Sequence, residues 1–211
     1  MSNTNRHMRT PIHELAYSSG LMSQSSWFIE FKKLVQLIAA GKSDEEMRYE
    51  CLTNNLLGYS KEYRARRVYG YLSKRASMLD EPLIDMFMSG DVHTQKLINL
   101  IAIVRGDRLF FEFLYEVYRE KNIFGHEVLE DMDFNAFFRE KGNQSEIVDA
   151  WSEGTKHHLR STYSSCMMDA ELLRMDDRKR IITPPIVDTA IITHMKDCGE
   201  EQLLKAVMGV S

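Results

Sequence analysis

The stretch 97-LINLIAIVRGDRLFFEFLYEVYREK-121 is the most apolar segment of the chain, and we expect it to decide the fold. Arg105-Gly106-Asp107 divides it into two helices, and Asp107 is placed to cap the second. The first half is apolar nearly all round, and the aromatic second half is apolar over more than one face. Such helices need neighbours on several sides. The rest of the chain is therefore expected to wrap around this pair.

A polar stripe in this stretch admits two interpretations. Glu112, Glu116 and Glu120 recur at four-residue spacing, so they share one helix face. They could be metal ligands, or they could form a solvated face partnered by Arg108 and Arg119. The solvated face is the simpler reading, and we predict it.

Composition indicates an ordinary globular protein rather than a disordered chain. The 211 residues are 44% hydrophobic and 27% charged, and the formal net charge is -4. The net charge does not indicate a nucleic-acid partner. Any binding to nucleic acid must therefore come from local patches of positive charge.

The lack of a recognisable targeting signal and the cysteine content both indicate a cytoplasmic protein. Three cysteines far apart in the sequence fit a reducing compartment, and they exclude a disulfide framework or a cysteine metal cage. We find no signal peptide and no apolar run near the roughly 20 residues that a spanning helix needs. We therefore expect a cytoplasmic protein without membrane contact.

The spacing of apolar residues and helix-breaking residues along the chain predicts a mainly α fold in three parts. Residues 1–16 are polar, contain Pro11 and are expected to form a flexible arm. Residues 17–142 predict a helical domain that ends near Gly142-Asn143. Residues 143–211 predict a smaller domain with winged-helix-like order.

One helix of the first domain carries a basic face. Ser60 is expected to cap the helix 61-KEYRARRVYGYLSKRASML-79. Its apolar stripe consists of Ala65, Val68, Leu72, Ala76 and Leu79. The opposite face carries Arg64, Arg67, Tyr71 and Lys74. Cations with a tyrosine among them can hold a phosphate backbone, although a merely solvated basic face has the same pattern.

The second domain offers another basic surface. A helix from Thr155 to about Ala170 places Lys156 and Arg160 on its outer side. Two short runs follow in 172-LLRMDDRKRIITPPIV-187, about a turn at Asp176-Asp177. Helix, turn, helix and hairpin are the parts of a winged helix, whose wing touches phosphate. The cations of this wing would be Arg174, Arg178, Lys179 and Arg180.

Catalytic signatures are missing from the sequence. It contains no GxxxxGK[ST] phosphate loop, GxGxxG turn, GxSxG elbow or HExxH pair. His157 and His158 are adjacent and cannot chelate together as an i, i+4 pair would. Asp131 and Asp133 are explained by helix capping. We expect no enzyme, no metal and no cofactor.

Three segments together resemble a known family. They are 17-YSSGLMSQSSWFIEFKKL-34, 101-IAIVRGDRLFFEFLYEVYREK-121 and 153-EGTKHHLRSTYSSCMMDAELL-173 with the trailing 182-ITPPI-186. They are similar to the BrxA family of BREX bacteriophage-exclusion defence systems. The resemblance implies an all-helical, cytosolic, non-catalytic component that binds DNA, with a helical domain similar to NusB-type RNA-binding proteins. It carries over no contact residues.

Our leading hypothesis is thus a DNA-binding accessory component of a phage-defence complex, with RNA as an open alternative. The contact residues predicted from the two faces are Arg64, Arg67, Tyr71, Lys74, Lys156, Arg160, Arg178, Lys179 and Arg180. The alternative is a protein-interaction adaptor that docks other defence subunits through the acidic-aromatic segment 127–138 and the aromatic N-terminal helix. A third hypothesis, a nuclease, would need carboxylates gathered around a divalent ion.

Overall fold

The structure, a computed structural model, describes residues 10–211 and is mainly α-helical, as the sequence predicts. The first half comprises η1 (Ile12–Glu14), η2 (Gly20–Ser23), α1 (Phe28–Ala39), α2 (Asp44–Leu52), α3 (Glu62–Ala76), α4 (Glu81–Ser89) and α5 (Val92–Arg105). The middle comprises α6 (Arg108–Phe113), the π-helical η3 (Leu114–Tyr118), α7 (Arg119–Ile123), β1 (Val128–Leu129) and α8 (Asp131–Gln144). The last part comprises α9 (Glu146–Asp149), α10 (Glu153–Asp169), β2 (Leu173–Asp176), β3 (Lys179–Ile182), α11 (Thr189–Asp197) and α12 (Glu201–Met208).

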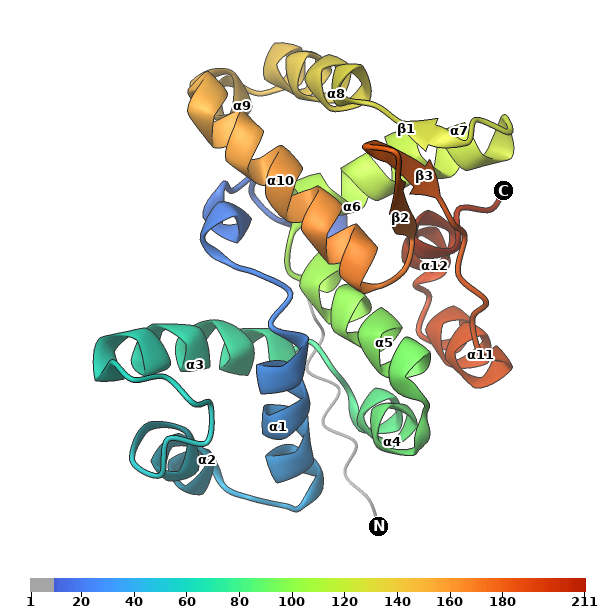
Figure 1. The fold of residues 1–211 in the computed structure, drawn as a ribbon. Coiled ribbons are helices and arrows are strands. Elements are labelled where there is room, and N and C mark those ends of the chain that lie inside the picture. The colour runs from blue at the N-terminus through green and yellow to red at the C-terminus, as the bar shows by residue number, and fades with distance from the viewer. Residues whose placement is uncertain (1–9) are drawn as a thin grey trace.

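Helix α5 is the centre of the molecule (Figure 1). Every residue from Leu97 to Arg105 is buried, and helices α1, α3, α4, α6, α10 and α12 all contact α5. Burial of each large aliphatic side chain contributes about 1.5–3 kcal/mol. The predicted pair of core helices, broken at Arg105-Gly106-Asp107, is therefore confirmed.

The predicted helix caps agree with the structure only in part. Asp107 Oδ1 accepts a hydrogen bond from the Phe110 amide at 2.9 Å and so caps α6 as predicted. The predicted Ser60 cap of α3 is wrong: the helix begins at Glu62, and Lys61 takes the cap position without a side-chain hydrogen bond. Lys61 itself is extended, with φ -115° and ψ 120°, so the helix starts one residue later.

Glu112 and Glu116 of the polar stripe belong to a partly buried ion-pair network, whereas Glu120 is exposed as a solvated face predicts. Glu112 accepts from Tyr17 Oη at 2.8 Å, from Arg108 Nε at 2.7 Å and from Lys141 Nζ at 2.7 Å. Lys141 also reaches Glu116 at 2.6 Å, and only 4% of the Lys141 side chain is exposed. These contacts come from the segment before η2 and from α8, which cover the stripe.

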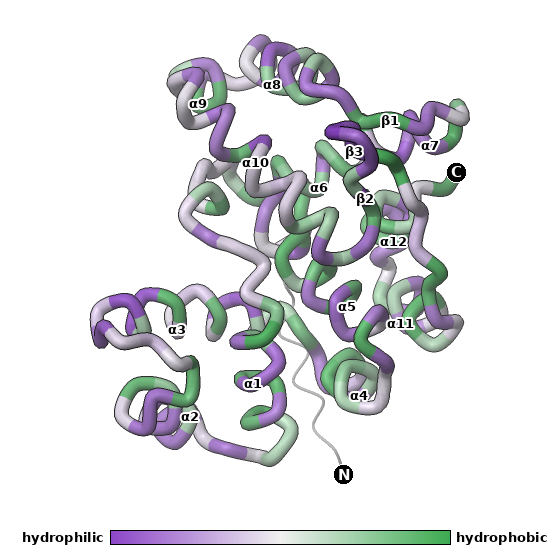
Figure 2. Tube along the Cα trace, viewed as in Figure 1, coloured by the Kyte–Doolittle hydropathy of each residue, from purple (hydrophilic) through white to green (hydrophobic). Residues whose placement is uncertain are grey.

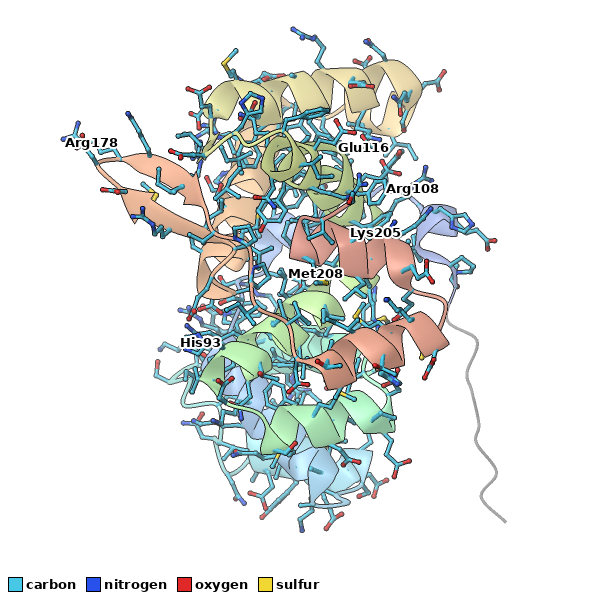
Figure 3. The ribbon with its side chains drawn as sticks, turned by 90° about the vertical axis from the view of Figure 1, so that its right-hand side faces the viewer. His93, Arg108, Glu116, Arg178, Lys205 and Met208 are labelled. Carbon is cyan, nitrogen blue, oxygen red and sulfur yellow. The ribbon has the colours of Figure 1, made fainter. Side chains whose placement is uncertain are left out.

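Of the two arginines predicted to pair with the glutamates of this stripe, only Arg108 does so. Arg108 binds Glu112 as expected. Arg119 instead lies 4.5 Å from the centre of the Tyr115 ring and donates to the Val210 carbonyl at 2.7 Å. Figure 3 shows Arg108 and Glu116 on the same side of the molecule.

A short strand that the sequence analysis missed joins the middle of the chain to the β2–β3 hairpin. Strand β1 pairs antiparallel with β3, with Val128 opposite Ile181 and Leu129 opposite Arg180, and β3 pairs antiparallel with β2. The sheet order is β1-β3-β2. A two-residue strand carries almost no periodic signal, so the sequence indicated only a connection here.

Residues on either side of Gly142 share one hydrophobic core. The rings of Phe110 and Tyr163 stack at 4.3 Å, although they belong to different predicted domains. The division at residue 142 stays a prediction. Of the predicted arm, residues 1–9 lie outside the described residues, and residues 10–16 contain η1, where Ile12 packs against the core.

Among the described residues, no helix combines the length and apolar character needed to cross a bilayer.

Replacing Lys141 with methionine should destabilise the protein by about 3 kcal/mol, because Glu112 and Glu116 would lose a shared buried cation. Urea unfolding of Lys141→Met measures this. Arg66→Met is the matched control, since Arg66 pairs with Glu62 at 2.6 Å on the surface. This substitution should lower the free energy of unfolding by less than about 0.5 kcal/mol. Equal losses in the two variants would show that the network is not an internal stabilising contact.

The buried carboxyl of Asp107 should make the stability of the protein depend on pH. Burial raises the pKa of its carboxyl from 3.8 to about 6, against the opposing hydrogen bonds from Phe110 and Leu109. The folded state thus keeps this proton to higher pH than the unfolded state, and stability falls as pH rises from about 4 to 6. Asp107→Asn keeps an acceptor and removes the charge, so its stability relative to the natural protein should rise over that range by about 3 kcal/mol. An offset between the two unfolding curves that is independent of pH would contradict this.

Candidate nucleic-acid interface

The outer face of α3 carries the first predicted group of contact residues, which we call the α3 face: Arg64, Arg67, Tyr71 and Lys74. The inner stripe of α3 is buried against α1, α2 and α5, as its spacing predicts. Arg64, Arg67 and Lys74 are exposed. Helix amphipathicity therefore turns these three cations outward together.

The members of the α3 face differ in how they are held. The Arg64 guanidinium lies 5.1 Å from the centre of the Tyr59 ring. Tyr71 is half-buried and stacks on Trp27 at 5.9 Å, so one of its ring faces is already covered. Within residues 10–211, neither Arg67 nor Lys74 forms an ion pair, whereas the neighbouring Arg66 is paired with Glu62.

The β2–β3 hairpin carries the second group. Asp177 and Arg178 have φ of 42° and 64°, which makes a two-residue turn of the kind that matches strand twist. The predicted turn at Asp176-Asp177 is off by one residue, because Asp176 pairs with Lys179 in the ladder. The hairpin is hydrophilic at its end (Figure 2), and Arg178 projects away from the body of the molecule (Figure 3).

We call Arg178 and Lys179 the hairpin tip. Both side chains are exposed, and in the part of the chain that the structure describes neither forms an ion pair. The adjacent Arg174 is different, because its guanidinium lies 2.9 Å from Asp176. The two cations of the tip are thus the members of the hairpin whose charge is not already balanced by a neighbouring carboxylate.

The remaining predicted cations are paired. Arg160 Nη1 lies 3.0 Å from Asp131, and Arg180 binds the same carboxylate as well as the Leu129 carbonyl. The hydrogen bond from Arg180, followed by the charges of Arg180 and Arg160, lowers the pKa of Asp131 despite some desolvation. Lys156 Nζ lies 3.0 Å from Glu153.

Asp131 is the residue of this surface that sequence reasoning misjudged. It was read as a helix cap, yet the capping bond to the Glu130 amide comes from Asp133 at 2.7 Å. Asp131 lies 49 residues from Arg180, and the two meet because β1 pairs with β3. No local pattern signals such a contact.

The fold does not merge the two groups into one groove. In Figure 1, α3 lies on one side of α5, and α10 with the hairpin lies on the other. The structure brings Arg160 and Arg180 together at Asp131 and leaves the α3 face and the hairpin tip as separate surfaces.

The aromatic side chains suggested for an adaptor are mostly buried, although Trp27 and Phe28 are only half-buried. Phe134, Phe137 and Phe138 are buried in α8, and Phe113 stacks on Phe134 at 4.4 Å. Phe31 of α1 is also completely buried. These rings form part of the core, and the exposed residues of the segment 127–138 include Glu127, Glu130 and Met132.

Comparisons with known proteins agree with this architecture. The fold is similar to the crystal structure of a protein from Magnetospirillum magneticum described as uncharacterized, with a TM-score of 0.77 and 13% identity over 92% of this chain and 98% of that chain. A protein from Bacillus cereus named "BREX protein BrxA" is 31% identical over 198 residues, which span 94% of this chain and 99% of the relative. The BrxA family model matches residues 15–199. The chain therefore belongs to the BrxA family.

Proposed function

We propose that this protein is a non-catalytic, DNA-binding component of a BREX phage-defence system that acts in the cytoplasm with other subunits of that system. Its family and the name of its relative from Bacillus cereus support the phage-defence role. The absence of catalytic signature motifs from the sequence supports a non-catalytic one.

The observation that carries the DNA-binding part is the hairpin tip. Arg178 sits at the outermost point of a two-stranded ribbon, next to Lys179, and both are exposed and without an ion pair among the described residues. A cation that no carboxylate neutralises gains most from a phosphate, because binding releases condensed counterions and breaks no existing pair. The tip is thus suited to contact a phosphate backbone as the wing of a winged helix does.

The α3 face supports a second contact. Arg67 and Lys74 line up on the outer side of one helix and are also unpaired in residues 10–211. Since the two surfaces are separate, a single duplex would have to bend or be long to reach both. The hairpin tip is therefore the primary site in this proposal.

Contacts of this kind set affinity but do not read sequence. The molecule carries a net charge of -4, so its attraction for DNA is local and strongly dependent on salt. RNA offers the same phosphates, and competition between DNA and RNA duplexes distinguishes them.

An adaptor without nucleic-acid binding is the second candidate. One specific observation favours it: Phe124 is 74% exposed beside the exposed Ile123 at the end of α7. An exposed aromatic residue of this kind is enriched at protein interfaces. A pull-down of other defence subunits with Phe124→Ser addresses this candidate separately.

Neutralising the two cations of the hairpin tip should weaken DNA binding. For Arg178→Gln with Lys179→Gln, two lost phosphate contacts should make the negative slope of log K against log salt shallower by about 1.8 and cut affinity about tenfold at moderate salt. Fluorescence anisotropy with a labelled duplex, from low to physiological salt, measures both quantities.

The matched comparison uses neighbouring arginines of α3. Arg67→Gln and Arg66→Gln remove the same charge, but Arg66 is already paired with Glu62, so Arg67→Gln should reduce affinity more.

If the natural protein gives no anisotropy change at micromolar concentration, the adaptor is favoured. Binding that ignores salt would also exclude the proposed phosphate contacts.

A further inference from the structure

Three side chains of different metal-binding types meet where α11 packs against α4. His194 and Cys198 lie four residues apart at the end of α11, and Asp80 is the N-cap of α4. One donor atom from each lies within 4.8 Å of the other two. His194 Nε2 is 2.9 Å from Asp80 Oδ1, and Cys198 Sγ is 3.7 Å from the same nitrogen.

This arrangement differs from a catalytic relay. In a nucleophile–histidine–carboxylate triad, the nucleophile and the carboxylate address opposite nitrogens of the imidazole. Here the thiol and the carboxylate both address Nε2 of His194. Donor atoms that converge on one point are the arrangement of ligands around a single cation.

The distances fit a tetrahedral ion of zinc size. Zinc bonds of about 2.0–2.1 Å to nitrogen and oxygen and 2.3 Å to sulfur put tetrahedral ligand atoms about 3.3–3.6 Å apart. The observed separations of 2.9 and 3.7 Å differ from these values by a few tenths of an ångström. The third separation, between the donor atoms of Asp80 and Cys198, is within 4.8 Å, so side-chain rotation would have to bring these two atoms to zinc distance.

We propose that Asp80, His194 and Cys198 form a three-ligand site for a divalent metal ion of the zinc class. Imidazole, thiolate and carboxylate together are a ligand set that zinc accepts. The position of His194 and Cys198 at i and i+4 places both on one side of their helix, as helical metal ligands require.

The surroundings support the ligand geometry and the charge balance. The Leu83 amide donates to Asp80 Oδ1 at 3.3 Å, which orients the carboxylate. Arg105 lies 3.7 Å from the other oxygen of Asp80 and would oppose a cation, but Arg105 is also bound to Glu200. The Asp80 carboxylate and a Cys198 thiolate would together bring two negative charges to a divalent ion.

Binding would join two distant parts of the chain. Asp80 and His194 are 114 residues apart, which is why the sequence analysis predicted no metal. The side chains of His194 and Asp80 are 16% and 25% exposed, so an ion can reach them. Because the ligands come together only in the folded chain, bound metal should raise the melting temperature.

Cobalt(II) is a direct probe, since a cobalt–thiolate bond gives a near-ultraviolet charge-transfer band and tetrahedral cobalt gives strong visible bands. Titration of the metal-free full chain should give both bands at one equivalent, and zinc should displace them. His194→Gln should lose the bands, and Cys198→Ser should lose the charge-transfer band and bind zinc at least tenfold more weakly.

His158→Gln is the matched control, because His158 is exposed and lies on α10, which contributes no ligand to this site. The melting temperature of each variant without metal checks that it folds. Absence of the bands in the natural protein at micromolar cobalt would overturn the proposal. Unchanged zinc affinity in folded His194→Gln or Cys198→Ser would overturn it as well.

Discussion

Burial of α5 on all sides is the constraint on which the rest of the structure depends. Polar side chains on a helix surrounded by other helices are stabilised by partners, because an unpaired polar group costs free energy there. Asn99 donates to the Ser26 carbonyl and accepts from Arg75, and Arg105 donates to the Met78 carbonyl and binds Glu200. These few bonds fix how α1, the α3–α4 connection and α12 sit against the central helix.

The same requirement sorts the cations of the chain into two classes. Arg75, Arg105 and Lys141 are buried and serve as internal contacts, each with several acceptors. Arg160 and Arg180 join β3 and α10 to the start of α8 through Asp131. Others, including the α3 face and the hairpin tip, are left at the surface, so a molecule of net charge -4 still presents local positive patches.

Local sequence signals predicted the core and the helices around it but not the long-range contacts. An almost continuous apolar run identified α5, Asp107 marked the start of α6, and two short runs about a turn marked the hairpin, since each signal acts over a few residues. Strand β1, the pairing of Asp131 with Arg180 and the meeting of Asp80 with His194 depend on tertiary packing. Of the candidate interface, the outward face of α3 was predictable, whereas which cations would be neutralised was not.

DNA binding through the hairpin tip is tested most directly by hydrogen–deuterium exchange of the full chain with and without saturating duplex DNA. The proposal predicts slower exchange in the presence of DNA in residues 173–182, a smaller effect in α3 and none in α2. Protection confined to other elements, or identical exchange with and without DNA, would contradict it.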